Sequence, residues 1–187
     1  MAIQIAQQAQ ADEVLNDSPF ALLCGMLLDQ QFPMERAFAG PAKVLERLGS
    51  LEPADIAAAD PEQFAALCAM PPAVHRYPGS IAGRIQTLAA HVVGKYDGHP
   101  ERLWEEATSG NDLLARLQAI PGFGKQKAQI FVALLGKQLG IRPQGWQDAA
   151  GAYAEPGSFR SVADVIDMDS LEKVRAFKKE SKAGSRE

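Results

Sequence analysis

Apolar residues recur at helical spacing along nearly the whole chain, and this pattern most constrains the fold. Residues 81–96 carry a continuous apolar stripe of this kind. Ser18-Pro19 and Asp60-Pro61 each place a capping side chain before a proline that suits the first turn of a helix. No run of alternating β-branched residues favours a strand, so the pattern predicts an all-α protein of roughly nine to eleven short helices.

The spacing also predicts where the helices lie. Asn111 is expected to cap one of them, and Ser161 or Ser170 to cap short helices near the end. The lysine-rich end, 177–187, has few apolar residues and is expected to be a disordered basic tail. The expected helices are Phe20–Gln31, Glu62–Met70, Ile81–Tyr96, Asp112–Ala119 and a helix from Gly124 to about Leu139.

Composition excludes several classes of protein. Of the 187 residues, 47% are hydrophobic and 22% charged, which excludes wholesale disorder. Cys24 and Cys68 are too few for a disulfide framework, a four-thiolate zinc site or an iron–sulfur cluster. No apolar run is long enough to cross a membrane, and the start of the chain has no basic signal-peptide region. A cytoplasmic location is therefore expected, on the nucleoid if the source is bacterial.

The net charge of -4 hides an uneven distribution of charge along the chain. Residues 113–147 contain five basic side chains and no acidic one, in an otherwise acidic chain. Such a window can bind an anion locally even when the whole protein is acidic. Its basic residues are Arg116, Lys125, Lys127, Lys137 and Arg142.

The segment Ile120-Pro-Gly-Phe-Gly124 within this window has the composition of a tight turn between two helices. Gly122 and Gly124 allow positive φ and close approach of another backbone. The amide groups of Gly122, Gly124 and Lys125 would be open donors at a helix N-terminus, a favourable place for a phosphate oxygen. An ordinary αα-hairpin is the simpler interpretation of the turn, but the acid-free flanks favour phosphate binding.

Residues Ile120–Ala128 (IPGFGKQKA) resemble the helix–hairpin–helix motif of the HhH-GPD DNA glycosylase superfamily, which includes endonuclease III and the 3-methyladenine glycosylases. Leu22–Gln31 (LLCGMLLDQQ) resembles an early helix of the same superfamily. The resemblance covers about residues 18–142. It implies two helical lobes with a DNA groove between them, one mainly of residues 18–110 and the other of the N-terminal segment with 111–176. The DNA contacts that it implies at the hairpin are Gly122, Phe123, Gly124, Lys125 and Lys127.

The resemblance is weaker where this superfamily carries its chemistry. Alignment without gaps places Gln126 at the position of the lysine that attacks the sugar in bifunctional members, so lyase activity is not expected. The same alignment places Gln144 at the position of the catalytic aspartate. Asp148 is then a candidate carboxylate, although a first-turn aspartate is also a common capping residue. Asp29 is the second candidate, with a buried hydrogen-bonding role as its alternative.

Six further residues are candidates for contact with DNA. Gln30 and Gln31 could enter an opened base pair or lie at a solvated helix end, and they favour the branch that acts on alkylated bases. Arg76 and Tyr77 combine a cation with an aromatic ring in what is otherwise a surface loop. Trp146 and Tyr153 are candidates for the base pocket, with core packing as the alternative.

The resemblance implies a base excision repair protein that binds double-stranded DNA and hydrolyses the N-glycosidic bond of a damaged base. A non-catalytic lesion sensor that has lost the aspartate and lysine is the alternative, and a protein–protein contact at the hairpin is a third interpretation. No cofactor or metal is expected. A monovalent cation bound by carbonyl groups of the hairpin would be compatible with the motif.

Overall fold

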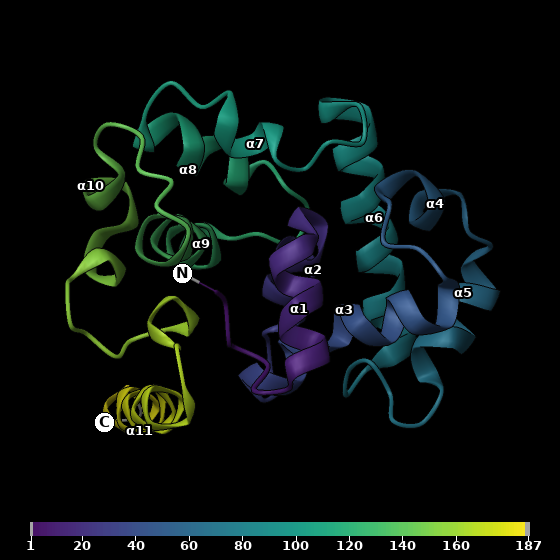
Figure 1. Ribbon diagram of the computed structural model, residues 1–187, viewed down its shortest axis with the longest axis horizontal. Helices are drawn as coiled ribbons and strands as arrows, with labels where there is room; N and C mark the ends of the chain where they lie inside the picture. Colours follow the sequence, from purple (N-terminus) through teal and green to yellow (C-terminus); the bar gives the residue numbers. More distant parts are fainter. Residues whose placement is uncertain (1, 186–187) are drawn as a thin grey trace.

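In the computed structural model, which describes residues 2–185, the regular secondary structure is helical and there is no strand within this range. The predicted all-α class is therefore confirmed (Figure 1). The α-helices are α1 (Ala9–Asp17), α2 (Pro19–Leu28), α3 (Met34–Leu48), α4 (Pro53–Ala58), α5 (Pro61–Ala69), α6 (Pro78–Tyr96), α7 (Arg102–Glu105), α8 (Gly110–Gln118), α9 (Lys125–Gln138), α10 (Trp146–Ala150) and α11 (Met168–Gly184), and the 3-10 helices are η1 (Gly151–Ala154) and η2 (Val162–Asp164).

Helix starts follow the capping side chains in the sequence. The Ser18 Oγ accepts a hydrogen bond from the Ala21 amide at 3.1 Å, and the Asp60 Oδ1 accepts one from Gln63 at 2.9 Å. Each cap satisfies an amide group that the first turn leaves without a partner. The cap of α8 is Ser109 rather than Asn111, because the Ser109 hydroxyl accepts from Asp112.

Three groups of helices position the candidate site. At one end of the molecule α4 and α5 pack on α6, and at the other end α8, α9 and α10 pack on one another (Figure 1). Between them lie α1, α2 and α3, which contact one another. The apolar helix α2 is buried along its whole length. Helix α2 is therefore the central helix of the molecule, and the loop that carries Asp29 follows Leu28 at its C-terminal end. The predicted division into two lobes with a groove stays a prediction.

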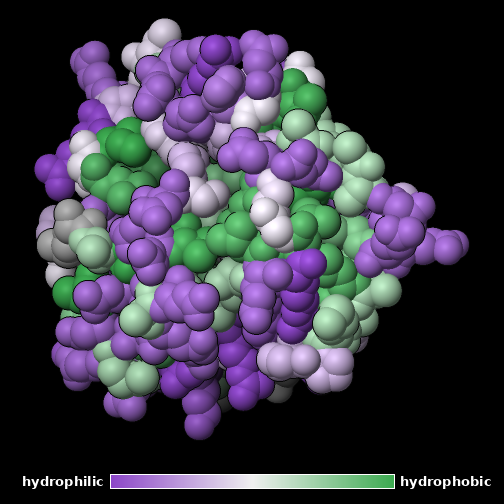
Figure 2. All heavy atoms as spheres, turned by 45° about the vertical axis from the view of Figure 1, so that its right-hand side comes forward, coloured by the Kyte–Doolittle hydropathy of each residue, from purple (hydrophilic) through white to green (hydrophobic). Residues whose placement is uncertain are grey.

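One hydrophobic core runs through all three groups. Phe20, Phe38 and Phe131 are among its largest fully buried side chains, and they come from α2, α3 and α9. On the face drawn in Figure 2, hydrophilic residues lie above and below a band of hydrophobic surface. No helix among the described residues is long and apolar enough to cross a membrane.

The end of the chain is helical, which corrects the expected disordered tail. Helix α11 runs from Met168 to Gly184 and so includes most of 177–187, of which 186–187 lie outside the described residues. Its start is well capped: the Asp167 Oδ1 accepts from the Ser170 amide at 2.7 Å, and the Ser170 hydroxyl accepts from the Asp167 amide at 2.9 Å. Ser170 is thus part of the capping box and Asp167 is the N-cap. Leu171 and Val174 anchor the helix by burial, a signal that the lysine-rich composition obscured.

Candidate nucleic-acid interface

The bend between α8 and α9 lies at the surface of the molecule. Pro121, Gly122 and Gly124 are exposed, whereas the side chain of Phe123 is buried with a relative exposure of 4% and packs edge-on against Phe131. Gly122 has φ +89°, a left-handed conformation that favours glycine. The Phe123 ring therefore anchors the bend in the core while the backbone around it faces solvent.

The start of α9 presents open amide groups next to this bend. The first hydrogen bond across the helix start is donated by the Ala128 amide to the Gly124 carbonyl at 3.0 Å. The amides of the three preceding residues have no acceptor within the helix, and the N-cap Gly124 has no side chain to supply one. These amides, with the positive end of the helix dipole, suit a phosphate oxygen.

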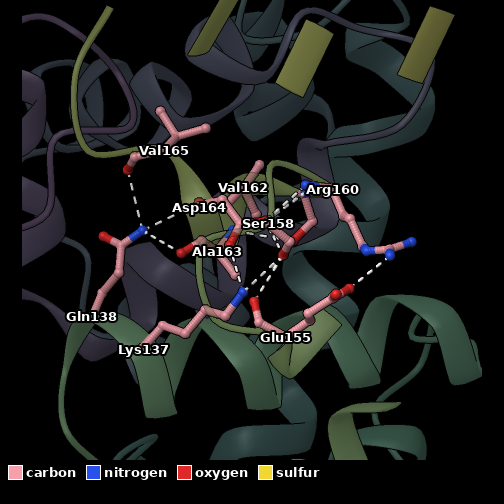
Figure 3. A network of polar contacts seen from close by, with 10 residues as sticks. Lys137, Gln138, Glu155, Ser158, Arg160, Val162, Ala163, Asp164 and Val165 are labelled. Atoms are coloured by element: carbon pink, nitrogen blue, oxygen red, sulfur yellow. Dashed lines mark hydrogen bonds and ion pairs between the residues drawn. The ribbon is translucent and has the colours of Figure 1, made fainter. Parts of the chain in front are cut away.

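Most of the basic side chains in 113–147, the window around the bend, contact other groups of the protein. Arg116 pairs with Asp112, and Arg142 lies over the ring of Trp146. Lys137 lies 2.5 Å from Asp164 and points into a polar network between α9 and η2 (Figure 3). Lys125 and Arg142 are exposed and have no ion pair in the part of the chain that the structure describes. Two of the five cations of 113–147, Arg116 and Lys137, are neutralised by acidic partners.

Lys127 fastens α9 to the end of α2 instead of extending into solvent. Its ammonium group donates to the carbonyl oxygens of Met26 at 2.7 Å, Leu27 at 3.4 Å and Asp29 at 3.5 Å. The last carbonyl groups of α2 lack intrahelical partners, so a cation there is favourable. Burial lowers the pKa of Lys127 to about 8, although the nearby Asp29 opposes this shift. This geometry does not support the expected role of Lys127 as a phosphate contact.

A cavity of about 1060 Å³ opens beside the start of α9. Its walls come from the loop after α2, from one face of α9, from η1 and from α11. It brings Asp29, Gln31, Arg76 and Tyr153 together with two residues of the hairpin helix, Gln126 and Gln129. We call this cavity the α9–α11 pocket. Its volume is large enough for a purine-sized ligand.

Asp29, and not Asp148, contributes the carboxylate of this pocket. The Asp29 side chain has a relative exposure of 8%, and its Oδ2 lies 3.6 Å from the Nζ of Lys178 on α11. Asp29 is the C-cap of α2, where its backbone amide donates to the carbonyl groups of Gly25 and Met26. Asp148 lies in the first turn of α10, is exposed and does not line the pocket. Asp148 is thus a first-turn residue of α10, whose N-cap is Gly145.

Gln126 and Tyr153 form a polar pair in the pocket wall. The Gln126 Nε2 donates to the Tyr153 hydroxyl at 2.9 Å, and both residues line the pocket. The residue aligned with the lysine of bifunctional relatives is thus a glutamine whose side-chain amide is hydrogen bonded to a tyrosine hydroxyl. Trp146 does not line the pocket: its ring lies against Gly136, where an added Cβ would come within 2.4 Å of two ring carbons. Trp146 is a packing residue between α9 and α10.

The Gln30-Gln31 turn separates the α9–α11 pocket from a smaller cavity of about 380 Å³. Gln31 is exposed, has φ +53° and lines both cavities. The buried side chain of His75 supports this turn through a hydrogen bond to its backbone. Because the His75 Nδ1 accepts from the Tyr77 amide at 3.1 Å, its Nε2 is the donor to the Gln30 carbonyl at 3.0 Å. Burial lowers the pKa of His75, which is consistent with this neutral tautomer.

Arg76 and Tyr77 project beside the same turn. Tyr77 is half exposed, Arg76 lies over its ring at 5.7 Å, and the two residues line different cavities. An exposed aromatic ring next to a cation suits contact with an unstacked base and a phosphate.

A further basic surface lies on α11, in the lysine-rich end that sequence reasoning described as a disordered basic tail. Four of the five cations of α11 line the pocket, and the periodic spacing of basic residues along the helix was the signal that could have revealed this surface. The group consists of Arg175, Lys178, Lys179 and Lys182.

Comparison with known families gave one match. A family model described as "HhH-GPD superfamily base excision DNA repair protein" matches residues 24–184, most of the chain and all of the elements that line the pocket. No curated protein and no solved structure gave a significant match.

Proposed function

Because the chain belongs to the HhH-GPD superfamily of base excision DNA repair proteins, we propose that it is a monofunctional DNA glycosylase acting on double-stranded DNA. The bend 120–124 holds the backbone of one strand, and the α9–α11 pocket receives a damaged base swung out of the duplex. The observation that carries this proposal is the position of Asp29: one carboxylate in a cavity beside the open amides of α9.

Asp29 is the candidate catalytic group. When the N-glycosidic bond breaks, positive charge develops on the sugar, and a carboxylate in a cavity partly closed to water stabilises that charge. The same group can accept a proton from the attacking water. Lys127 supports this role by fixing the backbone at the end of α2, since its ammonium group donates to the Asp29 carbonyl.

The proposal includes no lyase step. The residue at the lysine position is Gln126, which is not a nucleophile and is hydrogen bonded to Tyr153. Lys125 is exposed next to it and is absent from the pocket lining, and the Lys127 ammonium is held by α2 carbonyl groups. The expected product is an abasic site in an uncut strand.

Two variants test the assignment of the carboxylate. The protein is incubated with duplexes that each carry one lesion, and abasic sites are revealed by alkaline cleavage. Asp29→Asn should lower the single-turnover rate at least about 100-fold with unchanged DNA affinity, as expected for loss of a charged group that stabilises the transition state. Asp148→Asn is the matched control and should leave the rate unchanged. Loss of activity in Asp148→Asn alone would transfer the role to Asp148.

A non-catalytic lesion sensor is the second candidate function. It is favoured by the ion pair between Asp29 and Lys178, which neutralises the only carboxylate that the described residues contribute to the pocket lining. Preferential binding of a lesion duplex, with no abasic site formed on any lesion and no effect of Asp29→Asn, would establish the sensor and exclude the glycosylase.

A further inference from the structure

The lining of the α9–α11 pocket carries a large excess of positive charge. Six cations and one carboxylate, Asp29, contribute to it. Three of the cations have acidic partners, since Arg160 pairs with Glu155, Arg175 with Glu35 and Lys178 with Asp29. The other three have no ion-pair partner in the range 2–185. They are Arg76, Lys179 and Lys182.

One aromatic face of the pocket lining is already occupied by a cation of the protein itself. A pocket that binds a cationic ligand typically presents open aromatic faces to it. Here the Arg160 guanidinium already lies over the Phe177 ring at 5.5 Å. The protein's own cation therefore occupies the position that a cationic base would need over Phe177.

The chemistry of base release depends on the same charge. When the C1′–N bond of a neutral base breaks, the electron pair leaves with the base, which departs as an anion or is protonated as it leaves. Water then adds its oxygen to C1′, and its proton ends on the base. Positive side chains stabilise the anionic leaving group. A base alkylated on a ring nitrogen is already a cation, leaves as a neutral molecule and gains nothing from them.

We propose that the α9–α11 pocket selects neutral or anionic, carbonyl-rich bases, the products of oxidation or deamination, and rejects cationic N-alkylated purines. Lysine and arginine donors suit carbonyl acceptors, and unpaired cations near the ligand repel a charged purine. This inference rests on the proposed function because it needs a base in the pocket. It runs against the preference for alkylated bases that Gln30 and Gln31 suggested.

Binding to lesions that cannot be cleaved tests the inference separately from catalysis. Duplexes are prepared with 2′-fluoro nucleotides, which resist loss of the base, carrying xanthine, 8-oxoguanine, 7-methylguanine or undamaged guanine. Xanthine loses a proton near neutral pH, 8-oxoguanine is neutral and 7-methylguanine is a cation of similar size. We expect xanthine and 8-oxoguanine to bind at least about tenfold tighter than 7-methylguanine, corresponding to about 1.4 kcal/mol.

Charge-neutralising variants identify the source of the selection. In the double variant Lys179→Gln/Lys182→Gln, loss of phosphate contacts would weaken all duplexes alike, whereas loss of repulsion would improve only the relative affinity for 7-methylguanine. The ratio of affinities should therefore fall several-fold. Lys173→Gln is the matched control, because Lys173 lies on the same helix, pairs with Asp169 and does not line the pocket. It should leave the ratio unchanged.

The outcomes distinguish this inference from the proposed function. Equal or tighter binding of 7-methylguanine, or no preference for any lesion over undamaged guanine, overturns the inference. An unchanged ratio in the double variant also overturns it. Selective binding of xanthine and 8-oxoguanine, together with failure to release either base from the corresponding cleavable duplexes, would support the inference and contradict the glycosylase.

Discussion

The ammonium group of Lys127 donates to the Met26 carbonyl at 2.7 Å, so the second hairpin helix is fastened to the end of the central helix α2. This contact joins residues about 100 positions apart and sets where Asp29 lies relative to the hairpin. Replacing Lys127 by methionine leaves the carbonyl groups at the end of α2 without their donor. We expect the free energy of unfolding to fall by about 1–3 kcal/mol in a urea titration. Lys125→Met, at an exposed position, should change it by less than about 0.5 kcal/mol.

The titration of Lys127 should be distinct from that of the other lysines. With the pKa lowered to about 8, its ammonium form is lost well below the value of about 10.4 for an unperturbed lysine. The unfolded chain then binds this proton more tightly, so stability rises as the pH increases from about 8 to about 10.4 and is lost as the pH falls through 8. A 13Cε NMR titration should give a midpoint near 8 for one lysine, and Lys127→Met should remove that resonance. A midpoint near 10.4 for all lysines would contradict the burial of this group.

Two helical glycines should respond in opposite ways to alanine. An added Cβ at Gly136 would lie 2.4 Å from ring carbons of Trp146, so Gly136→Ala should destabilise the protein by about 1–3 kcal/mol. Gly94, within α6, has open space around the added atom, so Gly94→Ala should stabilise it by about 0.5–1 kcal/mol. Melting temperatures of the two variants check the pair. A neutral Gly136→Ala would show that Trp146 can move away.

The salt dependence of DNA affinity should report the cations of α11 rather than those of the basic window. Each phosphate contact contributes about 0.9 to the slope of log K against log salt concentration. Lys179→Gln/Lys182→Gln should lower the slope by about 1.8, while Lys137→Gln should leave it unchanged, because Lys137 is held by Asp164. Fluorescence anisotropy over a range of salt concentrations provides the measurement. Equal slopes in all three proteins would place the phosphate contacts elsewhere.

Local signals in the sequence were enough for the fold class and for the bend. Proline after a capping residue and an apolar stripe depend on neighbours a few positions apart, so they located α2, α5 and α6 closely. Ser109 was missed in favour of Asn111, since both residue types cap helices and only the geometry of the loop decides between them.

The candidate site depends on contacts between distant residues, and the sequence did not reveal them. Charge counting treated Lys137 as free, but its partner Asp164 lies 27 residues further along the chain. Sequence reasoning described the lysine-rich end as disordered, because the buried apolar anchors of its helix, Leu171 and Val174, lie upstream of 177–187. Placing Asp29 in a pocket with Lys178 required the folded structure.

Helix α11 is connected to the opposite wall of the pocket by two side-chain pairs, Lys178 with Asp29 and Arg175 with Glu35. The α11 wall of the pocket can therefore be altered by changing surface residues, while the bend 120–124 and the buried helix α2 stay intact. A library confined to the four basic positions of that helix that line the pocket would be a direct route to retargeting the protein toward other lesions.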